Sequence, residues 1–259
     1  MTTPRVYRAN AIVLGRTPLG ETDRIVSLFT REKGKLRAVA KGARRPVSKL
    51  AGGTELFGYC RVMLSSGQNL DVLTQVESRE SFPALRKSLD RIYAASYLTE
   101  LTDQFTDDRH PNADLFDLLL AALYITTSGT DLAWLTALYT LQMMDCVGYA
   151  PAFDPCVRCN RHSATYPGFS PALGGVMCPA CIPYGKGLMR TCDEAVRIGS
   201  ASQTTQLAEL ARIPVTPLAR RQILRLTRAF LTERLERPLR SARFLDEWLA
   251  SNDTNGETS

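Results

Sequence analysis

Long hydrophobic runs and histidine are both scarce in this sequence of 259 residues. No stretch of 18 or more apolar residues occurs, so we expect no membrane-spanning helix. The first residues contain no basic segment followed by an apolar one, so we expect no secretory signal and a cytoplasmic location. The two histidines, His110 and His162, have no suitable catalytic partner close in the sequence. General acid–base catalysis therefore has little support.

Motifs of several common enzyme classes are also missing. The segment Gly15–Thr22 has the spacing of a phosphate-binding loop, but Glu21 stands where lysine is needed and would repel phosphate. The zinc deaminase signature requires glutamate two residues after a histidine, and neither histidine has one. No G-x-S-x-G, H-E-x-x-H or G-x-G-x-x-G motif occurs. We therefore predict no catalytic residues and a protein that is not an enzyme.

Positive charge is concentrated in two blocks that flank an acidic middle. Residues 1–50 carry a net charge of +9, residues 51–205 carry −5 and residues 206–245 carry +6. Clustered Lys and Arg side chains release counterions when they meet phosphates, which favours binding to a polyanion. Ordinary solvated surface charge is the alternative, but an excess of nine within fifty residues favours a nucleic-acid partner.

Seven cysteines are present, and four of them form two C-x-x-C pairs. Eighteen residues rich in Gly and Pro separate the pairs, a spacing typical of a zinc ribbon. Four thiolates bind Zn²⁺ tetrahedrally and leave no open position for water, so the site should be structural. The sequence therefore predicts one zinc ion per chain, bound by Cys156, Cys159, Cys178 and Cys181. We expect the other three to be buried structural residues: Cys60, Cys146 and Cys192.

The first 82 residues consist of short apolar segments separated by turn residues. These segments predict five strands, over residues 8–16, 23–30, 35–40, 55–64 and 70–76. Five short strands in about eighty residues favour a small barrel. The tract from residue 41 to residue 49 is predicted to be a basic loop.

After the fifth strand the apolar residues recur at helical spacing. Asp90–Phe105 predicts one helix, and Asp193 is expected to start another after the cysteine segment. Thr216 followed by Pro217 is a strong helix start, and that helix should run toward Glu236. Side chains that can cap helix N-termini stand at three positions: Asn112, Asp131 and Thr216.

Two groups of basic residues are candidates for binding anions. Oligonucleotide-binding barrels bind along a strand face and its flanking loops, so we predict DNA contacts at Lys35, Arg37, Lys41, Arg44, Arg45 and Lys49. Four nearby aromatic residues could stack on bases or belong to the core: Tyr7, Phe29, Phe57 and Tyr59. One face of the last long helix carries a stripe that is either solvated surface or a second anion site: Arg221, Arg225 and Arg228.

Four segments of the N-terminal region closely resemble the pattern of the RecO family, the bacterial recombination mediators. The segments are Gly20–Asp23, Leu28–Thr30, Lys33–Lys35 and Ala40–Arg45. The resemblance extends over about residues 5–250, and the two C-x-x-C pairs agree with the family members that carry a zinc ribbon. It implies an α+β protein: an N-terminal oligonucleotide-binding β-barrel, then an α-helical domain interrupted by a four-cysteine ribbon. The expected divisions are 1–82 barrel, 83–150 and 186–250 helical domain, 151–185 ribbon, and 251–259 disordered tail.

The resemblance also implies a function without catalysis in RecF-pathway DNA repair. It implies binding of single- and double-stranded DNA, annealing of complementary strands, and help in loading a recombinase onto DNA coated by single-stranded-DNA-binding protein. The implied protein partners are the RecR ring and the acidic C-terminal tail of the single-stranded-DNA-binding protein, and the implied location is the nucleoid. The arginine stripe is our own hypothesis for the tail site. A zinc-ribbon protein that binds RNA or processes nucleic acids is the alternative.

Overall fold

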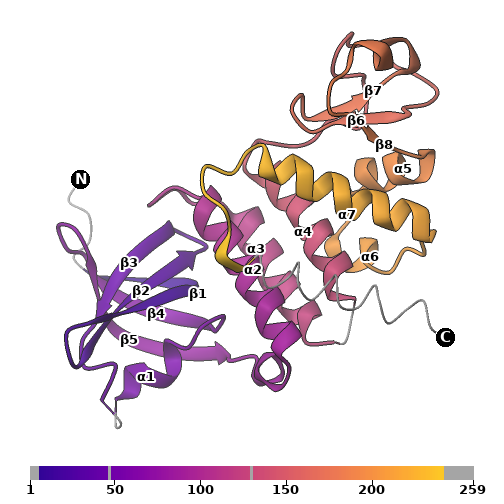
Figure 1. The fold of residues 1–259 in the computed structure, drawn as a ribbon. Coiled ribbons are helices and arrows are strands. Elements are labelled where there is room, and N and C mark those ends of the chain that lie inside the picture. The colour runs from indigo at the N-terminus through magenta and orange to yellow at the C-terminus, as the bar shows by residue number, and fades with distance from the viewer. Residues whose placement is uncertain (1–5, 46–47, 129–130, 242–259) are drawn as a thin grey trace. The chain divides into compact units, whose positions relative to one another are not determined.

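Alternation of inward and outward side chains lets the first five strands close around an apolar interior. The computed structural model describes residues 6–45, 48–128 and 131–241. In it the strands form a closed barrel in the order β1-β2-β3-β5-β4, antiparallel except where β3 meets β5 (Figure 1). The strands are β1 Val6–Leu19, β2 Asp23–Thr30, β3 Gly34–Ala40, β4 Tyr59–Ser65 and β5 Asp71–Glu80. The predicted barrel is confirmed.

The barrel interior is lined by small and branched side chains from all five strands. Its buried residues include Val13, Leu28, Leu36, Leu64 and Leu73. Several element bounds differ from the sequence-based expectation. The fourth strand begins at Tyr59 rather than at residue 55, and β1 and β5 are longer than predicted. A short helix, α1 Lys49–Gly53, begins at the last residue of the tract expected to be loop and follows the N-cap Ser48.

A pair of helices covers part of the outer face of the barrel. A short 3-10 helix, η1 Pro83–Lys87, precedes α2 Leu89–Phe105 and α3 Ala113–Thr126. The side chain of Asn112 caps α3 by accepting a hydrogen bond from the Leu115 N–H at 2.9 Å, as predicted. The ring of Phe116 lies 6.1 Å from that of Phe29 and 6.2 Å from that of Tyr59. Phe29 therefore belongs to the core.

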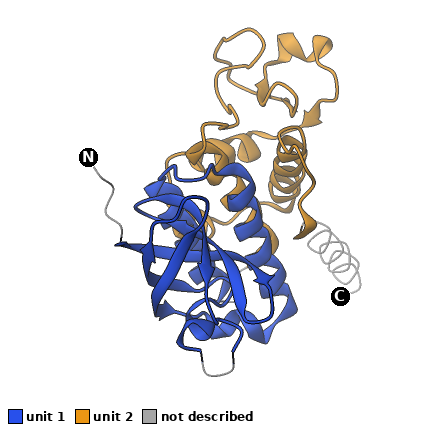
Figure 2. Ribbon diagram, turned by 90° about the vertical axis from the view of Figure 1, so that its left-hand side faces the viewer, with its two compact units in different colours: residues 1–128 blue, residues 129–259 orange. Residues whose placement is uncertain are grey.

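The chain divides into two compact units, residues 1–128 and 129–259 (Figure 2). The first unit contains the barrel with α2 and α3. The second contains a small three-stranded sheet in the order β7-β6-β8 together with further helices. Its elements are α4 Leu132–Cys146, β6 Gly168–Ser170, β7 Gly175–Met177, η2 Pro179–Tyr184, β8 Met189–Arg190, α5 Asp193–Ala201, α6 Leu207–Leu210 and α7 Pro217–Thr232.

Helix α7 packs against α4 and α5 within the second unit. The predicted caps are confirmed here too, because Asp131 accepts from the Trp134 N–H and Thr216 accepts from the Ala219 N–H. Helix α7 ends at Thr232, earlier than the expected Glu236.

The tail 251–259, predicted to be disordered, lies outside the described residues. Within the described ranges, no helix is long and apolar enough to cross a membrane.

Candidate nucleic-acid interface and metal centre

The basic loop after β3 is held in place by an aspartate from β2. Asp23 Oδ1 accepts hydrogen bonds from the Gly42 N–H at 2.8 Å and from the Thr22 hydroxyl at 3.0 Å. The Gly42 N–H, then the Thr22 hydroxyl and the neighbouring cations Lys41 and Arg45, lower the pKa of Asp23. Gly42 adopts a left-handed conformation with φ of 66°, which favours glycine. The loop therefore presents its cations from a defined backbone.

Five of the six predicted DNA-binding residues are exposed. They are Arg37 on β3, Lys41, Arg44 and Arg45 in the loop, and Lys49 at the start of α1. Arg44 also has a structural role, because its Nη1 donates to the Gly20 carbonyl at 2.7 Å and its N–H donates to the Thr22 carbonyl at 2.9 Å. The loop and the β1–β2 turn are thus tied together.

Lys35 differs from the other five because it is buried. Its Nζ donates to the Asp103 carbonyl at 2.6 Å and lies 3.6 Å from the Asp103 carboxylate and 4.0 Å from that of Asp108. Strand alternation does place it on the same face as Arg37, but the connection between α2 and α3 covers that face at Lys35. A lysine engaged in this way supports the fold rather than an exposed phosphate site.

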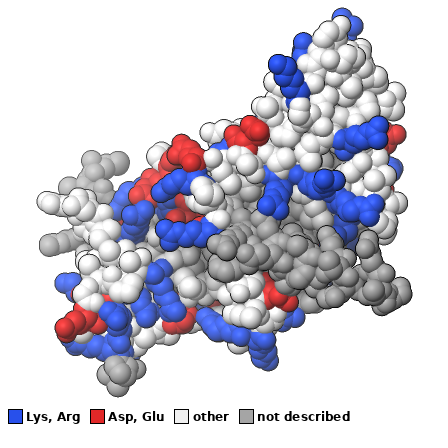
Figure 3. Space-filling view, viewed as in Figure 1, with Lys and Arg blue, Asp and Glu red and all other residues white. Residues whose placement is uncertain are grey.

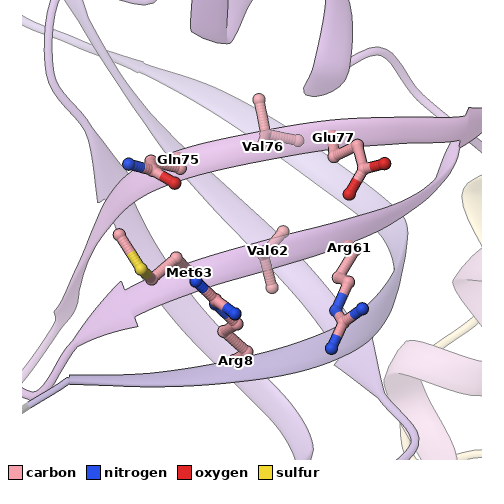
Figure 4. A pocket seen from close by; sticks show the side chains of 7 residues that line it. All are labelled: Arg8, Arg61, Val62, Met63, Gln75, Val76 and Glu77. Atoms are coloured by element: carbon pink, nitrogen blue, oxygen red, sulfur yellow. The ribbon is translucent and has the colours of Figure 1, made fainter.

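A shallow groove on the outer face of the barrel contains two arginines that sequence reasoning did not single out. Arg8 on β1 and Arg61 on β4 lie beside Gln75 and Glu77 of β5, around a cavity of about 240 Å³ (Figure 4). Strand pairing sets Arg61 directly opposite Glu77. Arg61 falls within the acidic middle of the sequence, so its position beside Arg8 emerges only from the pairing of β1 with β4. The groove contains both arginines and a glutamate, whereas the charged side chains of the basic loop are all positive.

The four predicted metal ligands meet in the second unit. The sulfur atoms of Cys156, Cys159, Cys178 and Cys181 all lie within 4.8 Å of one another. The Cys159 and Cys178 sulfurs are 3.8 Å apart. A tetrahedral site with bonds of about 2.3 Å requires sulfur–sulfur separations of about 3.8 Å, so the arrangement can hold a metal ion.

Backbone N–H groups stabilise a thiolate in this cluster. The Cys178 N–H donates to the Cys156 sulfur at 3.3 Å. Burial raises the pKa of the Cys156 thiol, but N–H donors of Cys178, Cys159 and Arg158 outweigh it and lower that pKa to about 6. Burial and the neighbouring sulfurs raise the pKa of Cys181 to about 12. A metal cation that displaces the protons of these four thiols would stabilise the closely spaced thiolates.

The other three cysteines lie outside the cluster. Cys60 is buried in the barrel, where desolvation raises the pKa of its thiol to about 12. Cys146 and Cys192 are half-buried rather than fully buried. The raised pKa of Cys60 makes its thiol a poor nucleophile at neutral pH.

The arginine stripe on α7 borders two neighbouring cavities. One, of about 440 Å³, is lined by Arg221 and Arg225 together with Leu188, Met189 and Leu218. The other, of about 530 Å³, is lined by Arg225 and Arg228 and shares Met189. All three arginines are exposed. The first cavity thus combines cations with apolar side chains, whereas the second also contains the carboxylate of Glu233.

These features define a class of protein: a closed oligonucleotide-binding-type barrel with a helical region and a cluster of four cysteines that could hold a metal ion. The family description "Recombination protein O N terminal" matches residues 1–82, and "Recombination protein O C terminal" matches residues 86–243. The chain belongs to the RecO family. Family membership supports a role in DNA repair and recombination.

Individual relatives match over nearly the whole chain. The "DNA repair protein RecO" of Pelotomaculum thermopropionicum is 35% identical over 244 residues, covering 94% of this chain and 95% of the relative. The protein of the same name from Roseiflexus sp. is 36% identical over 245 residues, covering 94% of this chain and 86% of the relative. The similarity includes both the barrel and the cysteine-bearing unit.

Proposed function

We propose that this chain is a DNA-binding recombination mediator without catalytic activity. It binds single- and double-stranded DNA, anneals complementary strands, and assists recombinase loading onto DNA coated by single-stranded-DNA-binding protein in RecF-pathway repair. Its place of action is the cytoplasmic nucleoid, where that DNA lies. The family membership supports the DNA repair role, and the basic surface of the barrel supports direct DNA contact.

The observation that carries this proposal is the Asp23-anchored loop. It holds exposed cations on the barrel in a fixed backbone, and five residues make up the proposed surface: Arg37, Lys41, Arg44, Arg45 and Lys49. Phosphate contacts of this kind give affinity that depends little on sequence and falls steeply with salt. We leave Lys35 out of this surface, because its ammonium group is buried against Asp103.

We further propose that the metal is one structural Zn²⁺ per chain. The cysteine-only donor set and the sulfur spacing fit zinc, and four protein ligands leave no open coordination position. The ion would be held by Cys156, Cys159, Cys178 and Cys181, and it would hold the two cysteine-bearing turns together.

Two protein partners belong to the same proposal. The acidic tail of the single-stranded-DNA-binding protein would bind beside Arg221, Arg225 and Arg228, where cations surround an apolar floor. The RecR ring is the second partner, and its contact residues are not assigned.

A strand-annealing assay tests the function directly. Complementary DNA strands coated with single-stranded-DNA-binding protein are mixed with the protein, and duplex formation is followed without any nucleotide. We expect faster annealing than with heat-denatured protein, and no gain from added ATP. Absence of acceleration would contradict the mediator proposal, and a preference for RNA strands of the same sequence would favour an RNA-binding function instead.

A further inference from the structure

A tyrosine protrudes from the metal-binding part of the second unit. Tyr184 ends η2, three residues after Cys181. Its exposed fraction is 67%, and among the described residues no large apolar side chain is more exposed. A single exposed ring is ordinary on a protein surface, so its role depends on the groups around it.

An arginine from the opposite cysteine pair holds this ring. Arg158 lies between Cys156 and Cys159, and its guanidinium carbon is 5.0 Å from the centre of the Tyr184 ring. The same guanidinium donates from Nη1 to the Tyr184 carbonyl at 2.9 Å. The Gly185 N–H donates to the Ile182 carbonyl at 3.0 Å and fixes the turn behind the ring. Arg158 therefore contacts both the ring and the backbone of Tyr184.

The sequence segment that contains Tyr184 is rich in cations. Between Cys156 and Arg190 the sequence contains no Asp or Glu and four cations, all exposed: Arg158, Arg161, Lys186 and Arg190. The nearest preceding acid is Asp154, which accepts from Tyr166 and pairs with His162 at 2.7 Å. Figure 3 shows blue Lys and Arg side chains on the visible face of this part of the molecule. Four thiolates around Zn²⁺ carry a net charge of about −2, so these four cations leave the segment net positive even when the metal is bound.

We propose that Tyr184 is a stacking platform for an unpaired base of single-stranded nucleic acid. Arg158 holds the ring, and Arg161 and Lys186 provide cations for the adjacent phosphates. Exposed aromatic rings on basic surfaces bind single strands in this way, because every base offers a flat face. The bases of a duplex are already stacked on one another and cannot use the platform. This inference rests on the proposed DNA-binding function and adds a second contact, remote in sequence from the basic loop.

The test compares three variants of the full-length protein: Tyr184→Ala, Tyr184→Phe and Leu173→Ala. Leu173 is a matched control, since it is exposed in the β6–β7 turn, at the opposite end of these strands from the Cys178 turn. Binding is measured with a thymidine homo-oligonucleotide and with a duplex of equal length. We expect Tyr184→Ala to weaken single-strand binding about tenfold. Tyr184→Phe and Leu173→Ala should bind normally, and duplex binding should change less than about twofold in all three.

Several outcomes would overturn the inference. Single-strand binding by Tyr184→Ala equal to the parent protein would do so, as would an equal loss for duplex, which would point to charge or folding. Metal content equal to the parent shows that the variant retains its cysteine site. If the parent protein binds neither DNA form, the proposed function fails as well. If it binds both in a salt-dependent way while Tyr184→Ala changes nothing, only the platform fails.

A fluorescent reporter gives an independent readout. Tyr184→Trp places an indole on the platform, and Leu173→Trp places one at the control position. Oligonucleotide should quench the first indole and leave the second unchanged, because only a stacked base contacts the ring. Equal quenching at both positions, or none at Tyr184→Trp, contradicts the assignment. Quenching by an acidic protein partner with none by oligonucleotide would assign the ring to protein binding and overturn it too.

Discussion

At the scale of single residues, Gly34 shows why the Lys33–Lys35 segment needs its glycine. Gly34 has φ of 70°, and a Cβ there would lie 2.1 Å from the His110 carbonyl oxygen. We predict that Gly34→Ala lowers the free energy of unfolding by more than about 2 kcal/mol, because backbone must move. Gly20→Ala is the control: its φ is 59°, yet nothing lies within 4 Å of its Cβ, so only about 1 kcal/mol of strain is expected. Urea unfolding measures both, and equal losses would contradict the steric explanation.

The buried carboxylate of Asp71 should shape the acid stability of the first unit. It accepts from the Tyr7 hydroxyl, from Arg109 Nη2 at 3.0 Å and from the Gly67 N–H at 3.1 Å. Burial raises the pKa of Asp71, but these donors outweigh it and lower the pKa below its usual value. A lowered folded-state pKa gives stability that is present above the unfolded pKa of about 3.9 and is lost as pH falls through the folded pKa.

We therefore predict two effects of Asp71→Asn. The variant should lose about 2 kcal/mol at pH 7, because hydrogen bonds to a charged group are removed. Its stability should then fall less than that of the parent protein below about pH 4. Asp107→Asn, at an exposed position, should stay within about 0.5 kcal/mol of the parent at pH 7. Unfolding titrations at several pH values measure this, and parallel pH profiles for Asp71→Asn and the parent would contradict the assignment.

Lys35 marks the limit of residue-scale prediction from the sequence. Alternation correctly relates Lys35 to Arg37, because strand geometry alone fixes which side chains share a face. It cannot show that residues 103–109 cover that face at Lys35 and leave Arg37 exposed. The hydrogen bond between the Gly42 N–H and Asp23 likewise joins residues that are far apart in the sequence, so no local sequence pattern predicts it.

At the scale of elements, local signals predicted most of the fold. The capping residues Asn112, Asp131 and Thr216 act through bonds three residues away, so the sequence alone locates those helix starts. The cysteine cluster was also predictable, since its spacing reflects metal geometry directly. Strand β8 could not be predicted, because its two residues, Met189 and Arg190, are too few to show a periodicity and become a strand by pairing with β6.

The cysteine-bearing element gives the third prediction. Metal analysis of protein purified without added zinc should find about one zinc per chain. Cys156→Ser should lose it and lower the soluble yield, because the sulfur cluster then lacks one of four ligands. Cys192→Ser, outside the cluster, should keep the metal. A metal-free yet fully folded parent protein would contradict the structural role of the site.

At the scale of the whole molecule, the two basic blocks of the sequence belong to different units. The first forms the exposed surface near Asp23, and the second supplies the arginines of α7. In the proposed function, DNA would bind the first set of cations and the acidic protein tail would bind the second. The charge count predicts a polyanion partner, but it does not show that β8 and α7 line common cavities.

The fourth prediction tests this division. Arg225→Glu should weaken binding of the acidic tail peptide at least about tenfold, because Arg225 borders both cavities and a reversed charge repels the peptide. Binding of naked DNA should be nearly intact. Arg212→Glu makes the same charge change at another exposed position and should bind the peptide normally. Fluorescence anisotropy with labelled peptide measures this, and normal binding by Arg225→Glu would place the tail site elsewhere.

The central claim, that the barrel loop binds DNA through phosphate contacts, is tested by the salt dependence of DNA affinity. Lys41→Ala combined with Arg45→Ala removes two exposed cations and leaves the Arg44 bond to the Gly20 carbonyl in place. Each lost phosphate contact should reduce the slope of log affinity against log salt by about 0.7–0.9. Arg79→Ala with Lys87→Ala, an equal charge change elsewhere in the first unit, should leave the slope unchanged. We predict a double variant of normal stability whose slope is flatter by up to about 1.4–1.8 and whose annealing is slower; an unchanged slope with unchanged annealing would contradict the account.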